Sequence, residues 1–403
     1  MLIKNRYLIA SLFSILSFST FAAAPPTHKV VTKTCLLKSL STPLKPIAKA
    51  KDFVLLNATE TDIQALAEAK KRQKSLCGGF VDVTFEWTQF NQKEVHSPVA
   101  FLQTYIKTKP DEHLQAPLEY KTQYQKQVNQ LLQKLNPQNM WGNLTTLTAY
   151  LDRYANSENG VQAANWLKDR IETMAKNNGR DDVSVELVST GFYKQPSVVA
   201  KIGNGTGPAI VVGGHMDTLS SSWEIKPGAD DDGTGTVTVL ELARRLIKTD
   251  MRFKKPVYVI WYAAEEMGLV GSGYVVQHFK QRNIPVAAVL QLDMTGYAYQ
   301  DESTMWLIND YVNKDLTAYL EKLITTYVKK PVQYTQCGYA CSDHASWNKA
   351  GVAAAFPFEA KFGQENPYIH RSSDIMAHLS LTHMTSFLKL ATAFVVELAE
   401  PTS

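Results

Sequence analysis

The stretch that decides the fold is Val211-Val-Gly-Gly-His-Met-Asp217, and Pro227-Gly-Ala-Asp-Asp-Asp-Gly-Thr-Gly235 follows it after a short interval. A short apolar run passes through two glycines into a histidine, and a glycine-flanked group of three aspartates comes next. Carboxylates this close in sequence repel one another unless water or a cation separates them. The stretch therefore predicts a metal site, and its remaining ligands must come from elsewhere in the chain.

Apolar runs that favour strands alternate with helical patterns along most of the chain. We expect strands over residues 183–188, 198–202, 209–213, 257–264 and 286–292, and helices over 120–135, 143–154, 161–176, 233–248, 314–328 and 380–399. This alternation predicts an α/β fold with three layers around a buried, mostly parallel sheet.

Three of these apolar runs lead directly into polar side chains. They end at His215, at Glu265-Glu266 and at Asp293. In α/β folds, functional sites gather beyond the carboxyl ends of the strands. We therefore expect these side chains to converge at one edge of the sheet.

The first part of the chain differs from the rest. Residues 1–24 have a basic start, an apolar run and small residues at the end, which is typical of a secretory signal peptide. Residues 25–117 predict a small α+β unit, with a helix beginning at Thr59-Glu-Thr-Asp62 and a strand over Phe80–Trp87. This unit could be an inhibitory or chaperone-like pro-region or a permanent accessory domain. The main domain would then occupy residues 118–403.

Composition limits the class of protein. The chain has 403 residues, 45% of them hydrophobic, and a net charge of +4, without a basic run that would favour nucleic acid. After loss of the signal peptide we expect no membrane attachment and export to the periplasm or the medium. In that oxidising setting the simplest cysteine pairing is Cys337 with Cys341 and Cys35 with Cys77, while zinc ligation by these thiols is the competing interpretation.

The donor set indicates the kind of metal. His215, one aspartate of the cluster, Glu265 or Glu266, Asp293 and a later histidine combine imidazole with carboxylate, which suits zinc, cobalt or manganese. Two metals would account for the excess of carboxylates. A pair of metals can polarise a carbonyl and supply hydroxide near neutral pH, and one glutamate should stay free to move the proton.

Six motifs occur in order along the chain. They are Gly213-Gly-His-Met-Asp217, Pro227-Gly-Ala-Asp-Asp-Asp232, Ala263-Ala-Glu-Glu266, Gln291-Leu-Asp-Met294, Cys337-Gly-Tyr-Ala-Cys-Ser-Asp-His344 and Asn366-Pro-Tyr-Ile-His370. From about Tyr120 onward the chain resembles the secreted bacterial leucyl aminopeptidases, a family of di-zinc exopeptidases. The resemblance implies a zinc-exopeptidase fold with a central mixed sheet, two Zn²⁺ ions, peptide substrates with a free N-terminus, and a monomer.

The resemblance also implies the ligands of both ions. Asp231 would bridge them, His215 and Asp293 would complete one ion, and Glu266 and His370 would complete the other. Asp230 and Asp232 would shape the loop or cap the helix that follows, and His344 would be structural.

Three further residues receive roles from the same resemblance. Glu265 would act as the general base and then as the acid, while a hydroxide that bridges the zinc ions attacks the peptide. Asp217 would orient the His215 ring without binding metal itself, and Tyr339 would donate a hydrogen bond to the developing oxyanion.

Specificity for leucine or another large apolar first residue would come from an apolar pocket beside the metals. By resemblance its lining would be Met294, Ile308, Phe356, Phe358, Phe362 and Ile369. The simpler interpretation is that several of these residues belong to the core. Glu365 stands where the family can carry an aromatic residue, which affects the mouth of the pocket.

Two other functions compete with that of an aminopeptidase. One is a different zinc exopeptidase or amidase on the same scaffold, such as a carboxypeptidase or a glutaminyl cyclase. The other is a binding protein that has lost catalysis. The presence of every ligand and of Glu265 disfavours the binding protein.

Overall fold

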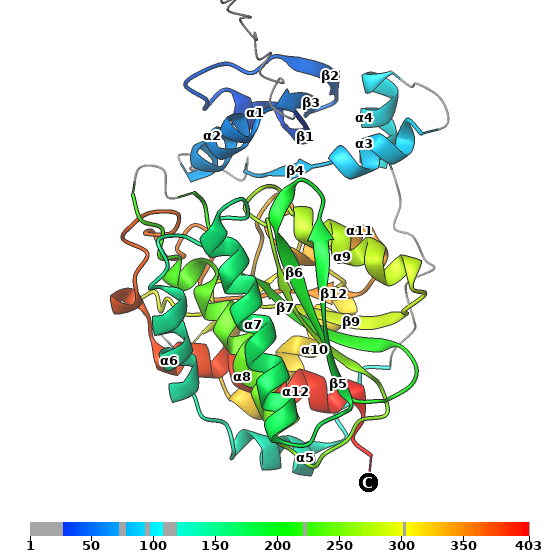
Figure 1. Cartoon of the computed structure of the whole chain (residues 1–403), viewed down its shortest axis with the longest axis vertical. Helices are drawn as coiled ribbons and strands as arrows, with labels where there is room; N and C mark the ends of the chain where they lie inside the picture. Colours follow the sequence, from blue (N-terminus) through cyan, green and yellow to red (C-terminus); the bar gives the residue numbers. More distant parts are fainter. Residues whose placement is uncertain are drawn as a thin grey trace, which may run out of the picture.

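The computed structural model describes residues 27–71, 78–92, 97–107, 119–220, 224–300 and 304–402. These ranges form a small N-terminal unit, coloured blue to cyan in Figure 1, and a larger C-terminal domain whose central sheet ends beneath it. The expected signal peptide and the boundary at residues 117 and 118 lie outside the described residues.

The N-terminal unit is a four-stranded antiparallel sheet with helices. Its elements are β1 (His28–Lys33), α1 (Thr34–Leu37), β2 (Pro46–Ala50), β3 (Phe53–Ala58), α2 (Glu60–Lys71), β4 (Phe80–Asp82), α3 (Thr84–Phe90) and α4 (Pro98–Lys107). The strand order is β2-β3-β1-β4. Helix α2 begins as expected, because the Thr59 amide donates to Asp62 Oδ2 (2.8 Å) and the Asp62 amide donates to Thr59 Oγ1 (3.3 Å).

The strand expected over Phe80–Trp87 is wrong beyond Asp82. Strand β4 ends there, and the Thr84 amide donates to Asp82 Oδ1 (2.8 Å). An aspartate that accepts from the amide two residues later turns the chain and favours a helix start. The rest of the predicted strand is therefore helix α3.

The larger domain contains the remaining elements. They are α5 (Gln125–Leu132), α6 (Gln138–Leu147), α7 (Glu158–Asn177), β5 (Val183–Thr190), β6 (Tyr193–Ile202), β7 (Ala209–His215), η2 (Ala229–Thr234), α8 (Gly235–Ile247), β8 (Val257–Tyr262), α9 (Val270–Gln281), β9 (Val286–Gln291), β10 (Met305–Ile308), α10 (Lys314–Leu323), η3 (Ile324–Val328), β11 (Val332–Thr335), α11 (His344–Lys349), β12 (Ala354–Ala355), β13 (Pro357–Phe358), η4 (Met376–His378) and α12 (Leu381–Ala399).

The central sheet has the order β12-β9-β7-β8-β6-β5 and confirms the expected α/β fold. Strands β12, β9, β7 and β8 run parallel to one another, whereas β6 pairs antiparallel with both β8 and β5. A smaller sheet, β11-β10-β13, lies beside it. Because β9, β7 and β8 are adjacent and parallel, their carboxyl ends meet at one edge.

Alternate residues of the buried strands pack on opposite faces of the sheet. Ile210 and Val212 join the core beneath α8 and α12, while Val211 and Ile260 join the core beneath α9. Both faces are covered, which explains the continuous apolar runs in the sequence. Within the described residues, no helix combines the length and apolar character needed to cross a membrane.

The helix expected over 143–154 is displaced in the structure. Helix α6 spans Gln138–Leu147, and the chain then leaves the helical path. The Arg153 amide donates to Thr218 Oγ1 (2.9 Å). The Arg153 guanidinium donates to the main-chain oxygen of Met216 (2.8 Å), in the loop after β7. These long-range contacts hold the end of the predicted helix in a non-helical conformation.

Candidate metal centre

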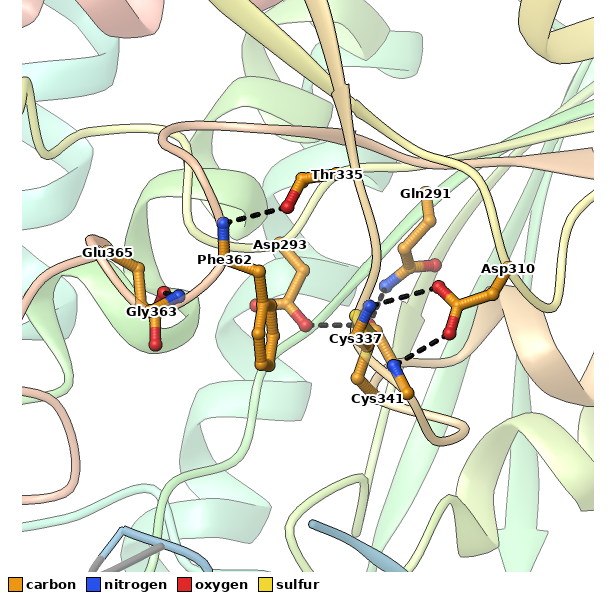
Figure 2. The surroundings of a disulfide bond; sticks show 11 residues. Gln291, Asp293, Asp310, Thr335, Cys337, Cys341, Phe362, Gly363 and Glu365 are labelled. Atoms are coloured by element: carbon orange, nitrogen blue, oxygen red, sulfur yellow. Dashed lines mark hydrogen bonds between the residues drawn. A yellow bond between two sulfur atoms is a disulfide. The ribbon is translucent and has the colours of Figure 1, made fainter. Parts of the chain in front are cut away.

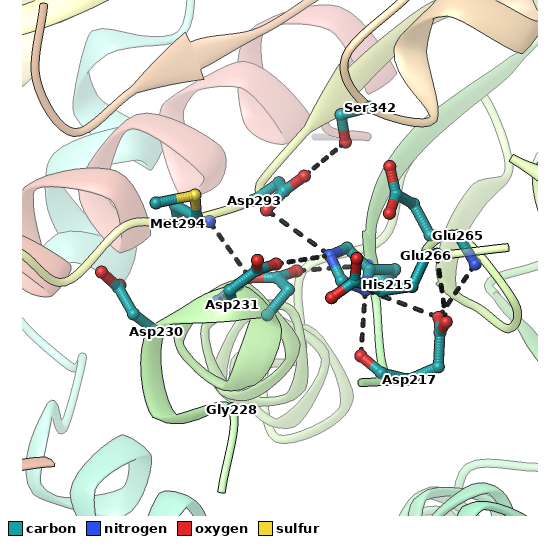
Figure 3. Close-up of polar contacts among 12 residues, drawn as sticks. His215, Asp217, Gly228, Asp230, Asp231, Glu265, Glu266, Asp293, Met294 and Ser342 are labelled. Carbon is teal, nitrogen blue, oxygen red and sulfur yellow. Dashed lines mark hydrogen bonds and ion pairs between the residues drawn. The ribbon is translucent and has the colours of Figure 1, made fainter. Parts of the chain in front are cut away.

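The three strand ends converge as the sequence predicts. Strand β7 ends at His215, β8 leads into Glu265 and Glu266, and β9 leads into Asp293. Figure 3 shows these side chains gathered in front of the turn that carries Asp231. All are buried. The sheet therefore brings together side chains that are far apart in the sequence.

Asp231 faces both candidate ligand histidines. Its Oδ1 lies 3.1 Å from His215 Nε2, and its Oδ2 lies 2.9 Å from His370 Nε2. Glu266 Oε2 lies 3.0 Å from His370 Nε2, and Asp293 Oδ1 lies 3.6 Å from His215 Nε2. The carboxylate of Asp231 thus joins two groups of potential ligands.

These spacings suit zinc. Zinc binds nitrogen and oxygen tetrahedrally at about 2.0–2.1 Å, which puts neighbouring ligand atoms about 3.3 Å apart. The four distances, from 2.9 to 3.6 Å, scatter around that value. In addition, Asp293 Oδ1 is buried and accepts no hydrogen bond within the described part of the chain. The arrangement fits a pair of zinc ions.

Neighbouring Asp232 also lies near His215 and Asp293. However, its Oδ2 accepts from the His215 amide (3.1 Å), and its Oδ1 accepts from the amides of Gly235 (2.8 Å) and Met294 (3.2 Å). Both oxygens are occupied by main-chain donors, including the first residue of α8. Asp232 is therefore better suited to shaping the loop than to bridging metals.

The electrostatics of the site favour cations. Burial alone would lower the pKa of His215, but the charges of Asp293 and Glu265, with hydrogen bonds to Asp217 and Asp231, raise it well above its usual range. Burial also acts to lower the pKa of His370, whose acidic neighbours raise it to about 9. The carboxylates thus attract positive charge strongly, and zinc would supply it.

Asp217 lies beside the His215 ring, as the sequence suggests, and it also holds the main chain of two glutamates. Its Oδ1 lies 3.5 Å from His215 Nδ1, and its main-chain oxygen lies 3.2 Å from the same atom. Its carboxylate also accepts from the amides of Glu265 (3.0 Å) and Glu266 (3.1 Å). One buried carboxylate therefore connects the ends of β7 and β8.

The disulfide Cys337–Cys341 is present, as expected, and it shapes a small loop (Figure 2). Asp310 accepts from the amides of Cys337 (3.0 Å) and Gly338 (2.7 Å). The loop carries Tyr339, which lines a small pocket together with Glu265, Glu266 and His370. Cys77 lies outside the described residues, so the pairing of Cys35 with Cys77 stays a prediction.

The six residues expected to line a specificity pocket gather in one apolar cluster. Tyr339 and Cys337 belong to it, and the predicted members are Met294, Ile308, Phe356, Phe358, Phe362 and Ile369. Glu365 accepts a hydrogen bond from the Gly363 amide of its own loop. The His344 ring packs against Phe356, tilted by 37° with ring centres 4.8 Å apart, and burial lowers the pKa of His344 to about 3. A neutral ring packed in this way is consistent with a structural His344.

Sequence reasoning missed the side chains that hold the aspartate turn. Arg153 is fully buried and donates to the main-chain oxygens of Met216 (2.8 Å), Pro227 (2.5 Å) and Gly228 (2.8 Å). No pattern in the sequence points to it. Asp374, also buried, accepts from the Asp230 amide (3.1 Å) and the Asp231 amide (3.2 Å).

Ser342 was missed as well, although it adjoins the disulfide motif. Its hydroxyl donates to Asp293 Oδ2 (2.6 Å), which leaves Asp293 Oδ1 directed toward His215. Asp230 behaves as expected for a loop-shaping residue, because its carboxylate accepts from the Gly296 amide (3.0 Å) and from Asn366 Nδ2 (3.0 Å).

Comparison with known proteins agrees with this geometry. Residues 197–395 match the description "Peptidase family M28". Leucine aminopeptidase 1 of Metarhizium robertsii is 38% identical over 285 residues, which cover 68% of this chain and 72% of that protein. The chain belongs to peptidase family M28.

Two solved M28-like structures match both parts of the chain. The LapA aminopeptidase of Legionella pneumophila is 43% identical, with a TM-score of 0.85 over 93% of this chain and 99% of that one. LapB of the same organism is 37% identical, with a TM-score of 0.83 over 93% of this chain and 100% of that one. The N-terminal unit is thus part of an arrangement that this M28 chain shares with similar proteins.

Proposed function

We propose that this M28 chain is an exported aminopeptidase that uses two zinc ions to hydrolyse the first peptide bond of a peptide with a free N-terminus. The observation that carries the proposal is the Asp231 carboxylate, which lies within 3.1 Å of both His215 and His370. Two bound zinc ions would polarise the scissile carbonyl and activate the attacking water. The leucine aminopeptidases among its relatives support this activity.

The residues of the chain have distinct roles in this proposal. Glu265 takes the proton of the attacking water and returns it to the leaving amine, while Glu266 stays a ligand. Tyr339 donates a hydrogen bond to the developing oxyanion from the same small pocket. Asp217 holds the main chain of both glutamates, so that the base and the ligand keep their relative positions.

The apolar cluster beside Tyr339 would select the first residue of the substrate. Phe356 and Phe358 are buried and contact each other, while Phe362 and Ile369 are partly buried beside them. Such a lining favours leucine or another large apolar side chain, because burying it removes apolar surface from water. The expected signal peptide and the Cys337–Cys341 disulfide support export.

The activity can be tested with one substrate panel and metal analysis. The zinc-loaded enzyme should cleave leucine p-nitroanilide and unblocked peptides, and it should leave N-acetylated peptides intact. Release of a C-terminal residue, or cyclisation of an N-terminal glutamine, would favour the other zinc exopeptidases or amidases. Zinc binding without turnover of any substrate would favour a binding protein.

Glu265→Gln separates the base from the ligands. We expect turnover to fall by about two to four orders of magnitude while about two zinc ions remain bound. Glu158→Gln is a matched control, because Glu158 is exposed and pairs with Lys194 on the surface. Loss of both zinc ions in Glu265→Gln would instead reassign Glu265 as a ligand.

We further propose that the N-terminal unit is inhibitory. Gly79 and Phe80 line the same small pocket as Glu265, Tyr339 and His370. Lys33 Nζ of the unit also donates to the main-chain oxygen of Gly338, beside Tyr339 (2.9 Å). A substrate could not reach the metal residues while these contacts persist.

Separation of the two units tests the inhibition. The folded full chain would be cut at a protease site inserted between Lys107 and Glu119, and the units would then be separated. Leucine anilide hydrolysis should rise on release and fall again when the N-terminal unit is added back. Equal rates before and after release would make the unit an accessory domain.

A further inference from the structure

The outer edge of β4 bonds to the loop that carries the catalytic glutamates. On its inner edge, β4 pairs with β1, with Asp82 opposite Val30. On its outer edge, the Asp82 amide donates to the main-chain oxygen of Gly268 (3.0 Å). Gly268 lies two residues after Glu266. The loop after β8 therefore presents a main-chain acceptor to an extended segment beside the metal residues.

Gly268 leaves room for a main chain to pass directly over it. A Cβ atom at this position would lie 2.6 Å from the Asp82 amide nitrogen and 3.1 Å from the Phe80 ring. Its φ of +98° is also one that residues with a side chain rarely adopt. The position thus combines close approach of a second main chain with a carbonyl oxygen that accepts from it, as in sites that bind extended peptides.

From Gly79 toward Asp82, the extended segment of the N-terminal unit leads away from the candidate metal centre. Gly79 lies against the ring of Tyr339, where a Cβ would come within 2.0 Å of Cδ2, and Phe80 follows over Gly268. Beyond them, a cavity of about 590 Å³ separates the two units. On the peptidase side its lining includes Tyr193, Leu269 and Tyr274. The linings of this cavity and of the small pocket at the candidate metal centre share Leu269 and Tyr339. The face formed by Tyr193, Leu269 and Tyr274 therefore adjoins the candidate metal centre.

The face already holds an aromatic side chain of the N-terminal unit. The ring of Phe85 lies 5.3 Å from that of Tyr274. Paired aromatic rings at this separation attract one another beyond simple burial. Once the N-terminal unit leaves, Tyr274 and the Gly268 oxygen lose these partners and become available to another chain.

We propose that this face binds the part of a peptide substrate that follows the scissile bond. The Gly268 carbonyl accepts an amide N–H of the extended peptide, and Tyr274 packs against an apolar or aromatic side chain further along. The preferred substrates are then unblocked peptides of about four or more residues with such a side chain after the first peptide bond. The proposal rests on the aminopeptidase function proposed above, and it adds a second determinant to the pocket for the first residue.

The test compares substrates with and without a chain beyond the scissile bond. The released, zinc-loaded enzyme would be assayed with leucine p-nitroanilide and with Leu-Ala-Phe-Ala. N-methylation would then remove each amide hydrogen after the scissile bond in turn. Methylation at one position should lower kcat/KM about fivefold, which is the worth of one hydrogen bond. A scan in which every methylated peptide stays within about twofold of its parent would overturn the proposal.

Tyr274→Ala and Tyr274→Phe form the matched pair of variants. The alanine variant should lower kcat/KM for the tetrapeptide about fivefold and leave the anilide unchanged, while the phenylalanine variant keeps the ring and both activities. An equal loss on both substrates would assign Tyr274 to stability and count against the proposal. Calorimetry with the same methylated peptides measures their affinity for the released Glu265→Gln enzyme. It therefore tests peptide binding to this face without turnover. Failure to hydrolyse both the anilide and the tetrapeptide, with tetrapeptide binding that methylation still weakens, would refute the proposed function and not this face.

Discussion

Replacement of Arg153 by methionine should destabilise the peptidase domain and weaken its zinc binding. The guanidinium is fully buried and makes hydrogen bonds of 2.8, 2.5 and 2.8 Å to three main-chain oxygens, two of them in the turn that leads to Asp231. Burial lowers the pKa of Arg153, and the nearby carboxylate of Asp374 opposes this effect most strongly. The side chain thus holds the aspartate turn through hydrogen bonds, and its charge also interacts with the buried Asp374.

The magnitude follows from these contacts. Hydrogen bonds from a charged donor contribute about 1.5–3 kcal/mol each, and methionine recovers part of the loss by filling the space. Three such hydrogen bonds, less what methionine recovers by packing, lead us to expect a loss of about 3–5 kcal/mol. At about 2–4 °C per kcal/mol, the melting temperature should fall by roughly 6–20 °C.

Thermal unfolding of the full chain, with zinc and after its removal, measures the stability. Competition with a coloured chelator measures zinc affinity, which should fall about tenfold because the turn that carries Asp231 loses its support. Arg153→Lys keeps the charge but offers a single donor group, so its stability and zinc affinity should lie between those of the parent protein and of Arg153→Met. Arg252→Met is the control, since its side chain is 45% exposed. An Arg153→Met protein within about 1 kcal/mol of the parent, with unchanged zinc affinity, would refute this reasoning.

Three further results are expected. Ser342→Ala removes the 2.6 Å hydrogen bond to Asp293, so zinc should bind about tenfold more weakly in chelator competition; equal affinity would argue against a positioning role. Gly79→Val in the full chain places side-chain atoms against Tyr339 and should raise leucine anilide hydrolysis by loosening the N-terminal unit; an unchanged rate, with the fold intact by circular dichroism, would speak against inhibition. Removal of metal from the released enzyme should abolish hydrolysis and added zinc should restore it; activity that survives chelation would exclude the metal mechanism.

The sheet and the residues at its strand ends could be predicted because both depend on local patterns. Val257–Tyr262 is apolar throughout and buried on both faces, and the polar pair Glu265-Glu266 follows it closely. Parallel neighbours place such ends together, so convergence with His215 and Asp293 needs no knowledge of the loops. Helix α2 was also predictable, since Thr59 and Asp62 form its start within four residues.

Local patterns misled where a side chain redirects the main chain. Phe80–Trp87 alternates as a strand should, yet the Asp82 carboxylate accepts from the Thr84 amide and begins helix α3. Residues 148–154 continue a helical pattern, but Arg153 is drawn to the loop after β7. Both errors arise because one polar contact outweighs the weak preference of a few residues for a regular element.

The candidate ligands therefore fall into two physical classes. His215, Glu266 and Asp293 lie at or just beyond strand ends, and the sheet positions them. Asp231 and His370 lie on loops, and buried charged side chains hold their main chain. Lys226 Nζ donates to the His370 oxygen (2.7 Å) across 144 positions in the sequence.

Asp374 joins the same two loops from the other side. It follows His370 by four residues, and its carboxylate accepts from the amides of Asp230 and Asp231. Contacts between residues so far apart leave no periodic trace in a sequence. This is why the strand-end residues could be found from chemistry, whereas Asp231 and His370 could be singled out only by resemblance to a family. The same division implies that mutations of Arg153, Lys226 or Asp374 act on the metal centre mainly through the two loop-borne ligands.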